Sequence, residues 1–375
     1  MALIWLFPAA AEGVELYRKG DLSMELAGHY ANILSGSETM AEEPYYSDFQ
    51  RMRLELQSQW GDDLSGLLTY DHRLLVSDAL KTPDFKIAQN RQRKQFLDID
   101  DQIAQDGNVR WDHLIYRGYL TYRSDVFDLR FGRQQVPWGV TYFWTPTDLF
   151  NPFDPLAIEK EERAGTDALD LKAYWDGLQY AELVYAPQRE HRQDTIAGKL
   201  HLAVGSQEFS FILAESKESE VFGADYFRNI GESVLRMELT RTDAQDEQDF
   251  WKFSANMDHT FPNTFYILGE YHHNGQGRRD KNTYERLRRL LGEVNFLAQD
   301  FFGLKLGYDV NPLIRLENHF IWTLTDHSIS MNPELRWSVN KNSEFLLGGL
   351  LFLGKQDTEY GQEHHVGYLR WKLFF

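Results

Sequence analysis

The sequence predicts an all-β fold, a transmembrane antiparallel β-barrel of about 18 strands with short periplasmic turns and long extracellular loops. Three observations predict it: apolar and polar residues alternate, the alternating runs reach about ten residues, and short turns alternate with long connections. In 113–123, Leu114, Tyr116 and Leu120 are expected on one face of a strand. Arg117 is expected on the other face. Such alternation with period two is typical of a strand with one apolar and one polar face.

The alternation and the turn residues divide the chain into eighteen strands. Short turns such as 61–63 and 205–206 contain Gly, Asp or Ser, which suit tight turns. The strands are expected at 20–34, 48–60, 64–76, 109–123, 126–136, 167–176, 178–187, 195–205, 207–217, 221–229, 231–242, 249–260, 263–274, 300–310, 313–325, 328–340, 343–354 and 364–375. An even number places both chain ends on the same side, as in bacterial barrels. The stretch 284–297 also suits a helix inside a loop, which leaves sixteen strands as the alternative.

The composition fits a protein with an apolar, aromatic-rimmed outside and a polar inside. Phe, Trp and Tyr make up 14% of the residues, yet the mean hydropathy is −0.51. Lys and Arg number 39 and Asp and Glu 57, so the net charge is −18, which argues against a nucleic-acid binder. The absence of Cys excludes disulfides, thiolate metal sites and haem attached by this chain through a Cys-x-x-Cys-His motif.

The two ends of the chain carry different signals. Residues 1–12 resemble the last part of a secretory signal peptide, an apolar core followed by small residues, and a short buried N-terminal strand is the alternative. A single barrel domain is then expected over 13–375. The last strand is an exposed edge until the barrel closes, and its apolar face resembles the C-terminal signal that the outer-membrane barrel-assembly machinery recognises. The residues of this expected assembly signal are Leu369, Trp371, Leu373 and Phe375.

The residues opposite the apolar faces are expected to line the pore. Most of them are basic, so the acidic excess of the chain is expected in the long connections. A ring of Arg and Lys in a narrow lumen attracts anions; alternatively, these cations pair with Glu and Asp on neighbouring strands and stiffen the wall. The expected pore-lining residues are Arg51, Arg53, Glu55, Arg117, Arg130, Lys172, Lys199, Arg236, Lys252, Arg315, Glu317, Arg336, Arg370 and Lys372. The long connections are expected at 35–47, 77–108, 137–166, 187–194, 217–221, 243–248, 275–299 and 355–363.

The connection at 137–166 is rich in Pro and aromatic residues. Pro removes backbone donors, so this stretch cannot pair as a regular strand, and it is too apolar to extend into water. We expect it to fold into the lumen and narrow it; a loop packed over the rim, or against a partner subunit, is the alternative. Its expected constriction residues are Trp138, Phe143, Trp144, Asp148, Phe150 and Asp154. The two Asp lack the spacing of a calcium loop, so no metal is assigned.

Several segments resemble bacterial outer-membrane porins related to the alginate-export type. They are LRFGRQQVPWG followed by WTPTDLFNPFDP, a VNPL turn with NHFIWTLTDHSISMNPELRWSV, and the closing YLRWKLFF. The resemblance covers most of 109–375 and implies a closed barrel channel with a polar, often Arg-rich lumen. Alginate exporters line their pore with many Arg, whereas Glu is mixed with Arg here, so polysaccharide export is not expected.

These observations favour a channel for passive diffusion of small hydrophilic, anionic solutes across the outer membrane of a Gram-negative bacterium, in contact with its lipid. The alternative is a barrel sheath that encloses a periplasmic or extracellular multihaem cytochrome and carries electrons across the membrane; the haem would belong to that partner. An enzyme is not expected. Adjacent pairs such as Asp71–His72 point to opposite faces of a strand, and no GxSxG, HExxH, Walker or GxGxxG motif occurs.

Overall fold

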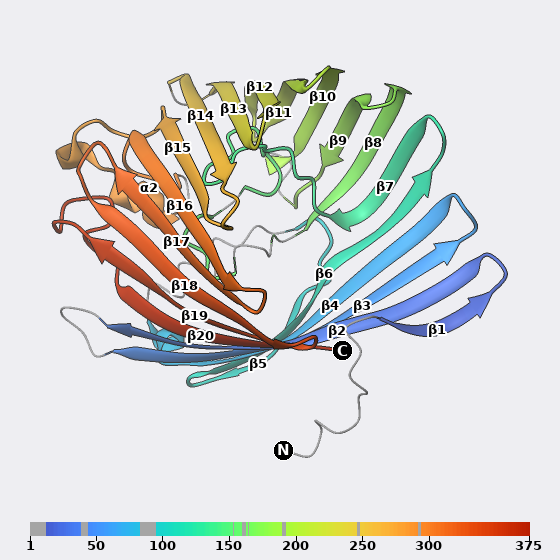
Figure 1. Ribbon diagram of the computed structural model, residues 1–375, viewed down its shortest axis with the longest axis horizontal. Helices are drawn as coiled ribbons and strands as arrows, with labels where there is room; N and C mark the ends of the chain where they lie inside the picture. Colours follow the sequence, from blue (N-terminus) through green and yellow to red (C-terminus); the bar gives the residue numbers. More distant parts are fainter. Residues whose placement is uncertain are drawn as a thin grey trace.

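A computed structural model describes residues 13–38, 44–82, 95–152, 154–159, 163, 165–189, 193–245, 248–291 and 294–375. Within these residues eighteen antiparallel strands form a closed barrel, in which the last strand pairs with the first (Figure 1). No helix among the described residues is long and apolar enough to cross a bilayer. The predicted fold class is therefore confirmed. Residues 1–12, the expected signal remnant, lie outside the described residues.

All eighteen predicted strands are present in the barrel. They are β2 (Leu22–Glu38), β3 (Tyr45–Trp60), β4 (Leu64–Ser77), β6 (Val109–Arg123), β7 (Phe127–Gln134), β8 (Thr166–Asp176), β9 (Gln179–Ala186), β10 (Thr195–Val204), β11 (Gln207–Ser216), β12 (Ser219–Ile230), β13 (Ser233–Asp243), β14 (Phe250–Thr260), β15 (Tyr266–Asn274), β16 (Asp300–Asn311), β17 (Ile314–Thr323), β18 (Ile329–Asn340), β19 (Ser343–Leu353) and β20 (His365–Phe374). The stretch 284–297 contains a short helix, α2 (Arg286–Leu291), and adds no strand. The sixteen-strand alternative is therefore wrong.

Two further strands were not predicted. The strand β1 (Val14–Lys19) pairs with Leu22–Leu26 of β2, beyond the point where β20 stops pairing with it. The strand β5 (Asp101–Asp106) pairs with the outer part of β6, beyond its contact with β7. Both extra strands therefore extend a barrel strand that is longer than its neighbour. The expected long connection at 77–108 accordingly contains β5 and a 3-10 helix at Asp78–Lys81.

One connection is shorter than predicted. Residues 217–221 were expected to form a long loop, but β11 and β12 are joined by Lys217 and Glu218 alone. Both residues have positive φ, 52° and 61°, as the central residues of a type I′ hairpin turn require. The prediction failed because neither residue is the Gly or Asn that usually marks such a turn.

The outer face of the wall is apolar, as the alternation predicts. Leu120, Trp175 and Leu369 are 49%, 53% and 39% exposed. One local assignment was wrong: a β-bulge in β6 interrupts the alternation opposite Thr69 and Tyr70. Leu114 therefore pairs with lumen-facing Asp71 rather than facing outward, and the ring of Tyr116 is buried beneath the guanidinium of Arg53, 3.8 Å away.

The seam between the first and last barrel strands is closed at Gly28 and Phe375. Each donates its backbone N–H to the carbonyl of the other, at 2.8 and 2.9 Å. A Cβ at position 28 would lie 2.7 Å from the Phe375 ring, so the ring occupies the space that the glycine leaves free. Nearby, Trp371 stacks on Phe345 and forms part of an aromatic row at the outer face. The role of this end as an assembly signal stays a prediction.

Candidate functional site: the lumen of the barrel

The strand register places all fourteen expected pore-lining residues on the inner face of the wall. Each lies at a position that alternates with the exposed apolar residues of its strand, and each pairs across the ladder with another inward-facing residue. Arg53, for example, pairs with Asp71, and Arg315 with Arg336. Whether these residues select solutes stays a prediction.

Most of these cations form ion pairs with carboxylates of the wall. Arg53 donates two hydrogen bonds to Asp71, at 2.5 and 2.7 Å. Equivalent pairs are Lys172–Glu182, Lys199–Asp225, Arg236–Asp258, Arg315–Glu317, Lys305–Glu317 and Arg336–Glu344. The expectation that the acidic excess lies in the connections is therefore wrong in part, because much of it neutralises the wall. For these residues the structure favours the alternative in which ion pairs stiffen the barrel.

Arg117 and Arg130 differ from the paired cations. Among the described residues neither has a carboxylate within 4 Å; Arg117 donates to Gln135 at 2.9 Å and Arg130 to Thr121 at 3.3 Å. Both line a cavity of about 480 Å³ on the inner side of β2, β3, β4, β6 and β7. The cavity is lined by three arginines, Arg117, Arg123 and Arg130, and by two carboxylates, Glu25 and Glu55, so cations exceed carboxylates in its wall and favour anions there.

The connection between β7 and β8 is called the inserted segment below, and its described residues, 135–152, 154–159, 163 and 165, lie inside the ring of strands (Figure 1). Its expected aromatic residues are buried, with Phe143 packed near Leu268 and Phe301 in one cluster. Trp138 and Phe150 belong to a second cluster with residues of β8 to β11. Residues 153, 160–162 and 164 of the expected loop lie outside the described residues. The position in the lumen excludes the rim alternative for the described part.

Glu238 on β13 binds the backbone of the inserted segment. Its Oε1 accepts hydrogen bonds from the amides of Val140 and Thr141, at 2.5 and 2.7 Å, and from the Thr141 hydroxyl. Its Oε2 accepts from the amide and the hydroxyl of Thr147, at 2.9 and 2.7 Å. The side chain is 1% exposed. Buried carboxylates need such compensation, and hydrogen bonds to them are stronger than neutral ones.

Glu270 on β15 binds the next part of the segment in the same way. It accepts hydrogen bonds from the amides of Tyr142, Phe143 and Trp144, at 2.8 to 3.1 Å, and from the Asn256 side chain at 2.8 Å. Sequence reasoning missed both glutamates. The available signal was an acidic residue at an inner-face position in the middle of a strand, but the pattern does not reveal which loop reaches it.

The inserted segment has a first arm, residues 138–151, and a second arm, residues 154–159. The second arm contacts another part of the wall through Glu159. Arg51 on β3 donates to both carboxylate oxygens, at 2.7 and 3.0 Å. Two residues of β20 lie near the same carboxylate: Lys372 Nζ at 3.5 Å and Arg370 Nη1 at 3.7 Å. One carboxylate therefore faces three cations from two strands.

The two Asp of the expected constriction have local roles. Asp148 accepts a hydrogen bond from the Asn151 amide at 2.8 Å and forms an ion pair with Arg163, near the end of the segment, at 2.9 Å. Asp154 accepts from the Leu156 amide at 2.9 Å and shapes a turn. No group of three or more His, Asp or Glu among the described residues is arranged to hold a metal ion.

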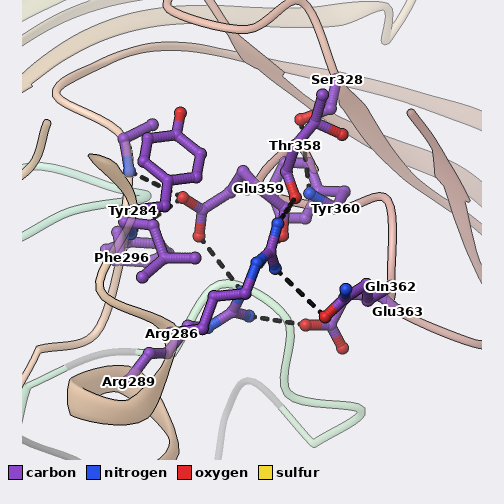
Figure 2. Close-up of polar contacts among 12 residues, drawn as sticks. Tyr284, Arg286, Arg289, Phe296, Ser328, Thr358, Glu359, Tyr360, Gln362 and Glu363 are labelled. Atoms are coloured by element: carbon purple, nitrogen blue, oxygen red, sulfur yellow. Dashed lines mark hydrogen bonds and ion pairs between the residues drawn. The ribbon is translucent and has the colours of Figure 1, made fainter. Parts of the chain in front are cut away.

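At the loop end of the barrel, carboxylates tie three connections together (Figure 2). Glu359, between β19 and β20, accepts from the amides of Leu297 and Ala298, both at 2.8 Å. Asp326, between β17 and β18, accepts from the Tyr284 hydroxyl at 2.8 Å and the Glu359 amide at 2.7 Å. The rim above β15 to β20 is therefore one hydrogen-bonded unit.

Two arginines of α2 add to this rim. Arg286 donates to the carbonyl of Thr358 at 3.0 Å, and Arg289 forms an ion pair with Glu363 at 2.8 Å (Figure 2). Burial raises the pKa of Glu359, although Arg289 and the two amides oppose that shift. Burial alone would lower the pKa of Arg289, but Glu359 and Glu363 raise it above its usual value. The charges of the rim are thus mutually compensated.

The fold is similar to that of solved porin structures. Pseudomonas aeruginosa OccK8 (OprE) aligns with a TM-score of 0.57 at 10% identity, over 94% of this chain and 98% of that chain. Acinetobacter baumannii OccAB2 aligns with 0.58 at 9%, over 94% and 98%. The outer membrane protein OprD from Pseudomonas aeruginosa aligns with 0.58 at 9%, over 94% and 93%. Likeness at such low identity shows the fold alone. No protein-family model and no curated protein matches the sequence.

Proposed function

We propose that the protein is an outer-membrane porin of a Gram-negative bacterium, through which small hydrophilic solutes diffuse passively, with a preference for anions. The observation that carries the proposal is a polar lumen in which Arg117 and Arg130 lack carboxylate partners among the described residues, in a barrel whose outer face is apolar. Porins have this combination of an apolar outer band and a polar interior. The similarity in fold to OccK8, OccAB2 and OprD supports it.

The inserted segment argues against the cytochrome sheath. It is bonded to β13 and β15 on one side and, through Glu159, to β3 and β20 on the other. It therefore crosses the space that an enclosed multihaem partner would have to fill. We also propose a channel rather than an enzyme, and no cofactor bound covalently by this chain.

We also propose that the protein is related to porins of the alginate-export type. Its support is that the quoted motif residues, LRFGRQQVPWG and WTPTDLFNPFDP, form the end of β7 and the inserted segment, the feature that shapes the lumen. The partners that we propose are outer-membrane lipid around the apolar face and the barrel-assembly machinery at the C-terminal strand.

Planar bilayers test the proposal. The purified wild-type protein should give discrete ion conductance. The Arg117→Ala plus Arg130→Ala variant removes two positive charges from the lumen, where the electrostatic potential can reach several kT. Its anion-to-cation permeability ratio should therefore fall by about twofold or more. A matched control is Arg278→Ala plus Arg288→Ala, which removes the same charge from two residues that pair with Glu285 in the connection between β15 and β16 and should leave the ratio near the wild-type value. A folded wild-type barrel without conductance would overturn the proposal.

A further inference from the structure

We propose that a cavity lined by Trp138 of the inserted segment and Asp170 of β8 is a binding site for a small hydroxy acid. In this site the hydroxyl group of the solute lies between the Trp138 indole N–H and the Asp170 carboxylate, and its own carboxylate lies at Arg130. The inference rests on the proposed function, because the solute has to enter the lumen. It names the chemical class of that solute.

The cavity lies between the inserted segment and the wall. Its volume is about 250 Å³, and its lining comes from residues 135–138 of the segment and from β7, β8 and β9. Arg130 also lines the cavity of about 480 Å³ described above, so an anion in the larger cavity reaches the smaller one at this side chain. A space below the usual 300 to 1,000 Å³ of ligand pockets fits a small solute.

Two buried polar atoms of opposite type line this cavity, and neither has a hydrogen-bond partner among the described residues. The first is Nε1 of Trp138, a donor, and this residue is 2% exposed. The second is Oδ1 of Asp170, an acceptor, and this residue is 9% exposed. Buried polar groups normally have partners, so an unpartnered donor and acceptor in one cavity point to a ligand.

The packing of the indole places it at the same part of the wall as Asp170. Trp138 belongs to a buried cluster with Ala168 and Val184. Ala168 is the preceding inner-face residue of β8, and Val184 pairs with Asp170 across the ladder between β8 and β9. The donor therefore comes from the segment and the acceptor from the wall beneath it.

A hydroxyl group satisfies both atoms. It donates its hydrogen to a carboxylate and accepts a hydrogen bond from an N–H, whereas an ammonium group only donates and a carboxylate only accepts. Water, or a proton that Asp170 shares with neighbouring Glu182, can also give Oδ1 a partner. Neither of these distinguishes a solute with a hydroxyl group from one without it, so the two explanations make different predictions.

The charges of the cavity leave Arg130 for the carboxylate of the solute. Two carboxylates of the lining have a cation within 4 Å: Glu182 lies 3.4 Å from Lys172, and Asp128 lies 3.6 Å from Arg123. Asp170 and Arg130 remain, and they are neighbours in the ladder between β7 and β8. A hydroxy acid has a donor for the first and a negative charge for the second, so it complements both.

The test compares sodium lactate with sodium propanoate, whose anions have equal charge and differ by one hydroxyl group. Single-channel conductance of the wild-type protein is measured in planar bilayers as a function of the concentration of each salt. The half-saturating concentration should be lower for lactate by about threefold or more, because a site built for a hydroxyl rejects the analogue that lacks it. Equal values overturn the inference, since water or a shared proton gives no preference.

Two tryptophan variants locate the preference. Trp138→Phe removes the indole N–H and keeps an aromatic ring, so the two half-saturating concentrations should become nearly equal. The matched control is Trp144→Phe, which removes the same group from another buried indole of the segment. Its Nε1 also lacks a partner within the described part of the chain, but Trp144 is not in the described lining of this cavity. A preference that survives in Trp138→Phe, or that is lost equally in Trp144→Phe, overturns the inference.

If Trp138→Phe does not assemble, Asp170→Ala examines the site from the wall. Loss of a negative charge favours both anions, so the measurement is the ratio of the two half-saturating concentrations, which should approach one. Asp258→Ala removes an equal charge from β14, beside Arg236, and should keep the wild-type ratio. An unchanged ratio in Asp170→Ala overturns the inference. The two proposals fail separately: a silent wild-type barrel overturns the porin, whereas a conducting barrel without a preference for lactate overturns only the hydroxy-acid site.

Discussion

The two arms of the inserted segment are held in the lumen by different interactions. Residues 138–151 are fastened by amides and threonine hydroxyls that donate to buried Glu238 and Glu270. Residues 154–159 contact the wall through Glu159, which faces three cations, and through apolar contacts of Leu156 and Ile158. The first arm has acceptors in the wall and donors in the segment, and the second arm has the reverse arrangement.

The difference lies in which side supplies the negative charge. The acceptors of the first arm, Glu238 and Glu270, belong to the strands β13 and β15 of the wall. The donors of this arm are backbone amides and threonine hydroxyls of the segment. The second arm instead brings its own carboxylate, Glu159, to cations of β3 and β20. We therefore expect the first arm to narrow the lumen.

The largest effect is expected when the first arm loses its acceptors. In Glu238→Gln plus Glu270→Gln the negative charge is removed and one oxygen of each carboxylate becomes an NH2 group that faces donors of the arm. Each charge-assisted hydrogen bond lost in this way costs about 1.5–3 kcal/mol. The arm should leave the wall, so single-channel conductance should rise and trypsin should cleave faster after Arg163. The control Glu182→Gln plus Glu208→Gln removes two wall carboxylates paired with Lys172 and His201 and should not open the channel. Unchanged conductance in a folded double variant would contradict the fixed role of this arm.

An intermediate effect is expected from Gly303→Ala on β16. The added Cβ would lie 2.5 Å from the Phe143 ring, which packs against the wall at this glycine. Overpacking of this kind costs about 1–3 kcal/mol, so the thermal unfolding midpoint should fall and the open-channel current should become noisier. Gly269→Ala is the control, because its Cβ would meet neighbours at an ordinary 3.5 Å. Equal midpoints for the two variants would show that Phe143 is not held at Gly303.

The smallest effect is expected from Thr147→Val. This change removes one hydroxyl donor, 2.7 Å from Glu238, and keeps the shape of the side chain and its amide. A cost of about 1.5 kcal/mol, the lower end for a hydrogen bond to a charged group, is expected because four other donors remain on the carboxylate. The unfolding midpoint should fall slightly, with the anion-to-cation permeability ratio unchanged. A changed ratio would mean that the first arm also selects ions.

The barrel could be predicted from the sequence because its signals are local. Alternation and turn residues place each strand without knowledge of its partner, and the inward position of residues such as Arg53 and Lys172 follows directly. The places where the prediction of the strands failed also have physical causes. The bulge opposite Tyr70 exchanges the faces of β6 at Leu114, and the polar strands β1 and β5 exist only because β2 and β6 extend beyond their neighbours.

The interactions inside the lumen could be predicted only in part. Pro and aromatic residues indicate that 137–166 folds inward, but they do not indicate where it binds. The partners of Thr141 and Tyr142 lie on β13 and β15, and their identity depends on the closed shape of the barrel rather than on any nearby residue. The same holds for Glu159, which looks like one of several solvated acids in the sequence.

The contacts of the inserted segment also determine when the lumen takes its final width during assembly. Thr141 and Tyr142 bind acceptors that lie 97 and 128 positions later in the chain. Until β13 and β15 have joined the wall, those amides have no acceptor, and contacts of such long sequence separation form late. We therefore expect docking of this segment to follow closure of the surrounding ring.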